Sequence, residues 1–571
     1  MSVAKDIQKS DAVDMRIGVE QTVWIDRVSD YLSDWISPIL VKETRQSMKS
    51  RQFVWTFFLL LLAVVVWTLA GLTLTNRNDQ LIAAGPDLLM GYLVILGFPL
   101  ALVIPFGAYR SLAREFEDGT IQLVSVTTMK AWQIVAGKLG SSLLQMLVYV
   151  SVLAPCIAFT YLLRGLSIPQ IGVALLVCVS GSIMLCCFAL FFAGLSKTRI
   201  FGVTMSVLLV VANIGVYILW ISFSGALAFG ELIFMTQEGG LLVTSGVLSL
   251  ILSTGLLLFS ATTALISFEA DNRSTIVRFM MLVQQTLLFA FAIGLFSYVM
   301  QPDMICVLTF ITGHYWLIMG LVMIGESPNL SSRVRRAIPD NSFMKSVVSF
   351  ILPGPGRGLV FAIINIWFCG VFFYLLVLLG YHWLPEPSND QASIGRMIRE
   401  PLNSVNYLQH LLGVGFCCVY PSFFLAMVYL VCTAIRRVYT VTSVHTVMIG
   451  IMSVAMITGS SLLYHYNAFD WGMRDEYSVD QVLNWYWTTT EIVFNGNTGL
   501  VPAMALIPAI LMGAVTLVAI AIASRELIVE KSAVPERVQW DIQEQKKNVK
   551  PFQGETIEDI FNEMEQGEDA D

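Results

Sequence analysis

Residues 110–138 read RSLAREFEDGTIQLVSVTTMKAWQIVAGK and form a polar interruption in a very apolar chain. The apolar runs on both sides are long enough to cross a bilayer, so this segment is predicted to be a loop outside it. Its pattern indicates helix, break, helix. Asp118 and Gly119 favour a turn, and Thr120 can cap a short second helix over residues 121–126. A two-turn helix on the membrane face contributes little to the fold and suits the groove of another protein.

The register of this loop resembles the coupling loop of the membrane subunits of type-2 ABC transporters, which are mostly exporters. In that family an acidic segment and Gly-Thr lead into a short coupling helix, followed by Thr-Pro, a Trp, an Ile-Val pair and Gly-Lys. The matching residues are Glu115, Glu117, Gly119, Thr120, Leu123, Thr127, Trp132, Ile134, Val135, Gly137 and Lys138. The chain departs from the usual residues at Gln122, Thr128, Ala131 and Gln133.

This resemblance implies a permease whose loop docks on a separate ABC ATPase (nucleotide-binding) subunit. ATP and Mg would be bound by that partner, so no cofactor is expected in this chain. The residues expected to couple to the ATPase are Glu115, Glu117, Gly119, Thr120, Leu123, Thr127 and Trp132. The residues alone also allow a plainer interpretation, in which the segment is a cytosolic loop with charges at two span ends.

Composition predicts an all-α membrane protein. Of the 571 residues, 56% are hydrophobic and only 13% are charged, which no ordinary soluble domain of this size shows. The nine cysteines lie in or at the ends of apolar runs, which favours a role in apolar packing over disulfides or zinc binding. Twelve apolar runs are predicted to span the bilayer, near residues 53–74, 88–108, 139–163, 171–193, 200–222, 241–266, 279–300, 305–324, 360–380, 411–432, 444–463 and 501–523.

The distribution of basic residues predicts the orientation of these twelve spans. With the N-terminus inside, 29 of the 34 Lys and Arg residues fall in cytoplasmic segments. Both termini and the 110–138 loop are therefore expected to be cytoplasmic, in what we take to be a bacterial cytoplasmic (inner) membrane. Two long segments, 383–410 and 464–500, would lie outside. The tryptophans of the second fit an aromatic belt at the interface, and a lid over a substrate exit is the alternative.

The chain is expected to contain two six-span halves with repeated topology but no demonstrable sequence repeat. The predicted parts are a cytoplasmic N-terminal segment 1–52 with an amphipathic interfacial helix over 23–36, a permease-like domain 53–266, a cytoplasmic hinge 267–278, a second membrane domain 279–523 and an acidic tail 524–571. In the second half, a cytoplasmic loop over 325–358 carries the basic cluster Arg333, Arg335 and Arg336. Lipid headgroups or a partner subunit can account for that cluster.

The predicted spans contain almost no ionisable side chains. His314 is the one ionisable side chain well inside a run, and we expect it to hydrogen-bond a neighbouring helix. No phosphate-binding loop, metal motif or catalytic constellation is recognisable, so the chain is predicted not to be an enzyme and to bind neither metal nor nucleic acid. The alternatives are a secondary transporter of an uncharged or lipidic substrate and a non-transporting membrane scaffold. Expected partners are the ATPase, membrane lipid and, if the second half is not a second permease unit, another copy of this chain.

Overall fold

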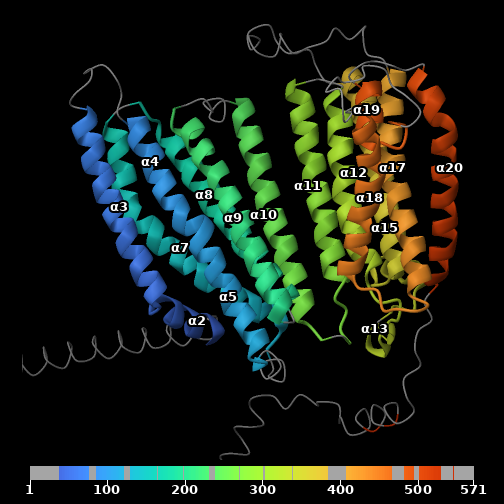
Figure 1. Cartoon of the computed structure of the whole chain (residues 1–571), viewed down its shortest axis with the longest axis horizontal. Coiled ribbons are helices and arrows are strands. Elements are labelled where there is room, and N and C mark those ends of the chain that lie inside the picture. Colours follow the sequence, from blue (N-terminus) through green and yellow to red (C-terminus); the bar gives the residue numbers. More distant parts are fainter. Residues whose placement is uncertain are drawn as a thin grey trace, which may run out of the picture.

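The protein is an integral multi-pass membrane protein built from long apolar helices (Figure 1). The computed structural model describes residues 38–75, 85–120, 129–163, 165–196, 199–229, 238–268, 270–299, 303–336, 338–383, 407–465, 481–493 and 500–528, together with 540 and 544. Within these residues every regular element is helical, which agrees with the predicted all-α class. Lipid offers no hydrogen bonds to the backbone, so apolar segments of this length satisfy their own amides as helices.

The first half begins with α2 (Pro38–Met48), a short helix whose apolar residues lie mostly in its first turn. The long helices that follow are α3 (Arg51–Thr75), α4 (Gly85–Phe98), α5 (Ile104–Glu117), α7 (Ala131–Leu162), α8 (Ile168–Leu195), α9 (Arg199–Ala228) and α10 (Glu238–Ile266). The amphipathic helix predicted over residues 23–36 lies outside the described residues.

The second half begins with α11 (Thr275–Val299) and α12 (Asp303–Ile324), which are followed by two short helices, α13 (Ser332–Arg336) and α14 (Ser342–Ile351). The remaining elements are α15 (Pro355–Trp383), α17 (Tyr407–Ile435), α18 (Ser443–His465), α19 (Trp485–Val493), α20 (Leu500–Ala523) and the 3-10 turn η5 (Ser524–Glu526). Because α11 starts at Thr275, the end of the predicted 267–278 hinge is helical.

Eleven of the described helices are long and apolar enough to cross a membrane. They correspond to eleven of the twelve predicted spans. The remaining run, 444–463, lies in helix α18 (Ser443–His465), of which residues 443–456 are the part described with side chains. The fold therefore shows eleven candidate spans, and the twelfth crossing remains a prediction.

The second span is longer than predicted and is not a regular α-helix throughout. Helices α4 and α5 are joined by a π-helical turn, η1 (Pro99–Val103), and continue as one unit to Glu117. Proline cannot donate a backbone hydrogen bond, and Pro99 stands at the start of this turn. The carbonyl oxygen of Leu100 accepts a hydrogen bond from Ser182 Oγ on α8 at 2.6 Å. Such π turns often lie at functional sites.

The two halves lie side by side, and they meet where α10 packs along α11 (Figure 1). Gln284 of α11 donates a hydrogen bond to Thr254 Oγ1 of α10 at 2.9 Å across this boundary. Figure 1 places α2, the end of α5 and α13 on one side of the molecule, which we call the loop face. Helix α19 lies at the opposite face. The segments predicted to be cytoplasmic thus lie at one face, and α19, from a segment predicted to be outside, lies at the other.

Candidate functional site

The predicted break in the 110–138 loop is present where α5 ends. Asp118 closes the helix by donating its backbone N–H to the Arg114 carbonyl oxygen at 2.8 Å. Gly119 follows with a φ of +67°, a left-handed conformation that side chains disfavour. Thr120 is exposed, and its Oγ1 donates to the Glu115 carbonyl oxygen at 3.3 Å. The chain therefore leaves α5 through a turn that favours glycine.

The short coupling helix predicted over 121–126 lies outside the described residues, as do Leu123 and Thr127. The chain is described again before α7, where the backbone N–H of Lys130 donates to Gln133 Oε1 at 2.9 Å. Gln133, a departure from the family pattern, thus caps α7 as a glutamate can. Trp132 lies in the first turn of α7 with half of its surface exposed, and it is available to a partner.

A buried lysine joins the two helices that flank the loop. The side chain of Lys138 is only 1% exposed, and its Nζ lies 2.9 Å from Glu115 Oε1 and 3.0 Å from Glu43 Oε1. Nζ also donates to Ser111 Oγ at 2.8 Å, and that hydroxyl donates to Glu43 Oε2 at 2.8 Å. These contacts connect α7, α5 and α2 at the loop face. We call Lys138, Glu43, Glu115 and Ser111 the lysine junction.

The lysine junction also explains why a glycine precedes Lys138. A Cβ added to Gly137 would lie 2.9 Å from Ile39 Cγ2 and 3.2 Å from the Leu40 backbone nitrogen. Without a side chain at this position, α2 can lie against α7. The close approach brings Glu43 within reach of Lys138, a contact that the sequence analysis did not foresee because nothing in the sequence aligns α2 with α7.

The two acidic residues of the loop have different roles, because they lie on different sides of α5. Glu115 points inward to the lysine junction, whereas Glu117 is exposed. This agrees with their separation of two residues, which is about 200° around a helix. The base that meets Glu115 is Lys138.

Two cavities lie in the first half, and their linings differ in chemistry. A polar hollow of about 530 Å³ borders the lysine junction between α2, α5 and α7. A second, almost wholly apolar cavity of about 590 Å³ lies among η1, α8, α9 and α10. Its lining includes Leu100, Gly181, Leu185, Trp220, Phe223 and Ile251. Cavities of this size hold small organic ligands, and an apolar lining selects hydrocarbon over water.

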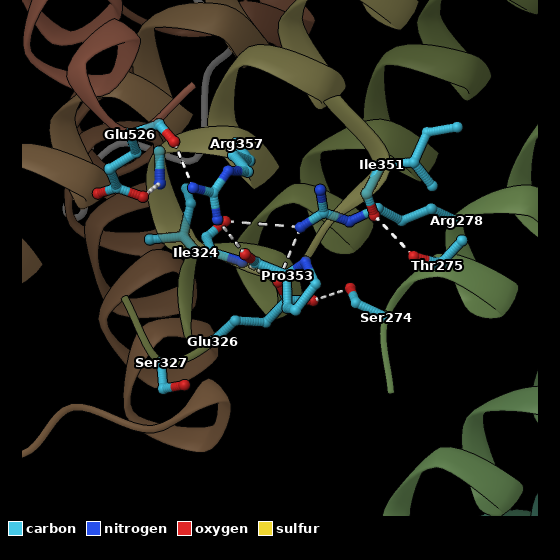
Figure 2. Close-up of polar contacts among 12 residues, drawn as sticks. Ser274, Thr275, Arg278, Ile324, Glu326, Ser327, Ile351, Pro353, Arg357 and Glu526 are labelled. Atoms are coloured by element: carbon cyan, nitrogen blue, oxygen red, sulfur yellow. Dashed lines mark hydrogen bonds and ion pairs between the residues drawn. The ribbon is translucent and has the colours of Figure 1, made fainter. Parts of the chain in front are cut away.

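The second half has its own buried ionic cluster at the loop face, shown in Figure 2. Arg278 of α11 is fully buried, and its Nη2 lies 2.7 Å from Glu326 Oε2, just beyond α12. Glu326 Oε2 also accepts the Gly354 backbone N–H at 2.7 Å. Arg357 of α15 donates to the backbone carbonyls of Pro353, at 2.6 Å, and of Glu526. Sequence analysis missed this cluster because its members are far apart in the chain.

His314 differs from expectation. Its Nδ1 lies 2.9 Å from the carbonyl oxygen of Phe310 in its own helix, α12, rather than bonding a neighbouring helix. The ring stacks on Trp485 of α19 with centroids 4.0 Å apart. Trp485 is itself buried, so this tryptophan packs inside the bundle and does not belong to an interfacial belt. The neighbouring Tyr486 is 62% exposed and can serve in such a belt.

Within the described residues, no group of three or more His, Cys, Asp or Glu side chains is placed to hold a metal ion. Comparison of the chain with protein-family models, with curated proteins and with solved structures finds no match. The candidate site therefore rests on its own geometry, in which the described ends of the loop carry exposed residues and a buried lysine joins α2, α5 and α7 beside them.

Proposed function

We propose that this protein is the membrane-spanning permease of an ATP-driven ABC transporter, an exporter, that couples to a separate ATPase subunit through the 110–138 loop. The ATPase would bind ATP and Mg. Binding of ATP would close the ATPase dimer, and the loop would carry that rigid-body movement into the spans. The exposed residues Glu117, Thr120 and Trp132 would meet the ATPase.

The lysine junction is the observation that carries this proposal. A loop that transmits force must be attached firmly to the helices it moves, and Lys138 joins α7 to both α5 and α2. Helix α5 continues through η1 into α4, so the loop connects directly to a helix that crosses the whole bundle. A charged network buried at this position is costly unless its geometry is maintained.

The apolar cavity supports a substrate with a hydrocarbon part. It adjoins η1, the irregular segment of the span that ends at the loop. Movement of α5 would therefore alter the cavity wall formed by Leu100. The same cavity keeps a second candidate open, a secondary transporter of a lipidic substrate, which differs from the first in its source of energy.

The two candidates are separated by purifying the full-length chain from its native membrane in mild detergent. A permease should retain a subunit with ATPase motifs in a fixed ratio, and the reconstituted complex should transport only with ATP. A photo-crosslinker at Trp132 should attach to that subunit. The same group at Tyr486, an exposed residue at the opposite face, is the matched control. Transport driven by an ion gradient with no ATPase bound would refute the proposal.

A further inference from the structure

The same helix pairs pack together in both halves of the chain. Counting the long helices within each half, the first unit is α3, α4–η1–α5, α7, α8, α9 and α10, and the second is α11, α12, α15, α17, α18 and α20. In both units the second helix packs on the third, fourth and fifth, and the sixth packs on the third and fourth. In both, the fourth also packs on the third and fifth, and the first packs on the third.

Neighbours along a chain pack together in most helical bundles, so the informative pairs are those that skip a helix. Both units contain four such pairs: second with fourth, second with fifth, third with sixth and fourth with sixth. The loops that join the second and third helices of the two units nevertheless have unrelated sequences. One arrangement of six helices thus appears twice. The units differ at their first helix, because α3 packs on α4 whereas α11 packs mainly on α10.

Similar polar residues recur at the loop face of both units. Each third helix carries a glycine followed by a buried base, Gly137-Lys138 in α7 and Gly356-Arg357 in α15. Both glycines allow a close approach. A Cβ on Gly356 would lie 2.9 Å from the Ala523 carbonyl oxygen, as one on Gly137 would meet α2.

A glutamate near the end of each second helix also pairs with a buried base. Glu115 meets Lys138 of the third helix, whereas Glu326 meets Arg278 of the first. The partner has changed, but the effect is the same, because in both units the end of the second helix is joined ionically to another helix of its own unit.

The loop after Glu326 therefore occupies the place of the 110–138 loop, and it is folded. Val334, Ile338 and Leu352 form a small apolar core within it. The tip of this loop is α13, which is visible beyond the bundle at the loop face in Figure 1. The side chains of Arg335 and Arg336 on α13 are exposed.

We propose that residues 275–528 are a second permease unit and that α13 is a second docking element for an ATPase subunit. One chain would then supply both membrane units of the transporter and bind two ATPase subunits, without a second copy of itself. The second docking surface is basic, through Arg335 and Arg336, so it suits an acidic patch on the partner. The identity of this partner rests on the proposed function, whereas the single-chain assembly does not.

The assembly is tested by producing two differently tagged full-length copies in one membrane and capturing one tag in detergent. We expect the captured protein to contain a single tag. Recovery of both tags in one complex would overturn the proposal, whatever the function. The native mass of the captured complex should also correspond to one 63.3-kDa chain with two ATPase subunits. One ATPase subunit per chain would overturn the second docking element.

The docking element is tested in the same complex by a photo-crosslinker at Arg336. We expect attachment to the ATPase from Arg336 as well as from Trp132, and none from Tyr486 at the opposite face. The R335E/R336E double variant should reduce ATPase occupancy from two subunits per chain to one. Lys345→Glu, a charge reversal on α14 in the same loop, is the matched control and should leave two. Crosslinking from Trp132 alone would leave the proposed function intact and refute α13 as a docking element, whereas no ATPase at either position would refute both.

Discussion

Replacing Lys138 by Met tests whether the lysine junction holds the loop to the membrane helices. Methionine keeps the length of the side chain and removes its charge. Glu43 and Glu115 would then face each other without the cation, with side chains only 12% and 17% exposed. Each carboxylate lies about 3 Å from Nζ, so the two like charges would be at most about 6 Å apart and would repel by about 3 kcal/mol at an effective dielectric constant of about 20. Removal of one partner from a buried ion pair costs about 3–5 kcal/mol.

We therefore expect Lys138→Met to lower the free energy of unfolding by about 3 kcal/mol or more. Glu115→Gln should cost less, because Glu43 and Ser111 still surround the lysine. When Lys138→Met and Glu115→Gln are combined, the loss of unfolding free energy should be smaller than the sum of the two single losses, with a coupling energy of about 1–3 kcal/mol. Glu117→Gln, on the same helix but exposed, is the control and should change stability by less than about 0.5 kcal/mol.

The measurement is equilibrium unfolding of the purified full-length protein in mixed micelles, with an increasing mole fraction of an anionic detergent and tryptophan fluorescence as the signal. Lys138→Arg should retain most of the stability, since it preserves the charge. If Lys138→Met is no more destabilising than Glu117→Gln, or if the coupling energy is near zero, then the junction does not hold α2, α5 and α7 together. The mechanical basis of the proposed function would then be lost.

Three further predictions concern separate parts of the first unit and of α12. Gly119→Val places a β-branched residue at a φ of +67° and should weaken ATPase binding by about tenfold, with membrane insertion unchanged. Asparagine tolerates this conformation, so the Gly119→Asn variant should bind the ATPase normally. Pull-down of the ATPase measures both variants. Gly181→Met should fill the apolar cavity and abolish transport, whereas Gly172→Met on the same helix but outside the lining should not, as measured in liposomes. His314→Gln should lose about 1 kcal/mol of aromatic contact with Trp485 yet keep transport; loss of transport at equal expression would indicate ion coupling.

The spans were predictable because lipid imposes a simple rule on the sequence. Any run of about 20 apolar residues must form a helix, and the structure confirms eleven such helices. The break at Gly119 was predictable for a local reason, since only glycine adopts its backbone conformation at low cost. The exact helix ends could not be predicted in the same way. Polar residues at a span end can be helical or irregular, so the sequence did not indicate that α5 continues to Glu117 or that α7 starts at Ala131.

The lysine junction and the Arg278 cluster were hidden for a different reason. Each joins residues from helices that are distant in sequence, and apolar patterns do not record which helices become neighbours. Lys138 was visible as part of a Gly-Lys pair, but its partner Glu43 lies 95 residues earlier. His314 was assigned to a neighbouring helix because a lone polar side chain in a span commonly bonds across helices. Here the carbonyl of Phe310, one turn back, satisfies it.

The positions of the two ionic clusters bear on how movement can pass through this protein. Each lies at the loop face, where the second helix of a unit ends, and each joins that helix to others of the same unit. Between the units the main packing among the described helices is that of α10 with α11, which includes the hydrogen bond from Gln284 to Thr254. Rigid attachment within a unit and a single boundary between units are what a rocking movement requires. In the proposed mechanism the units would move against each other along α10 and α11 while each kept its loop attached to its own helices.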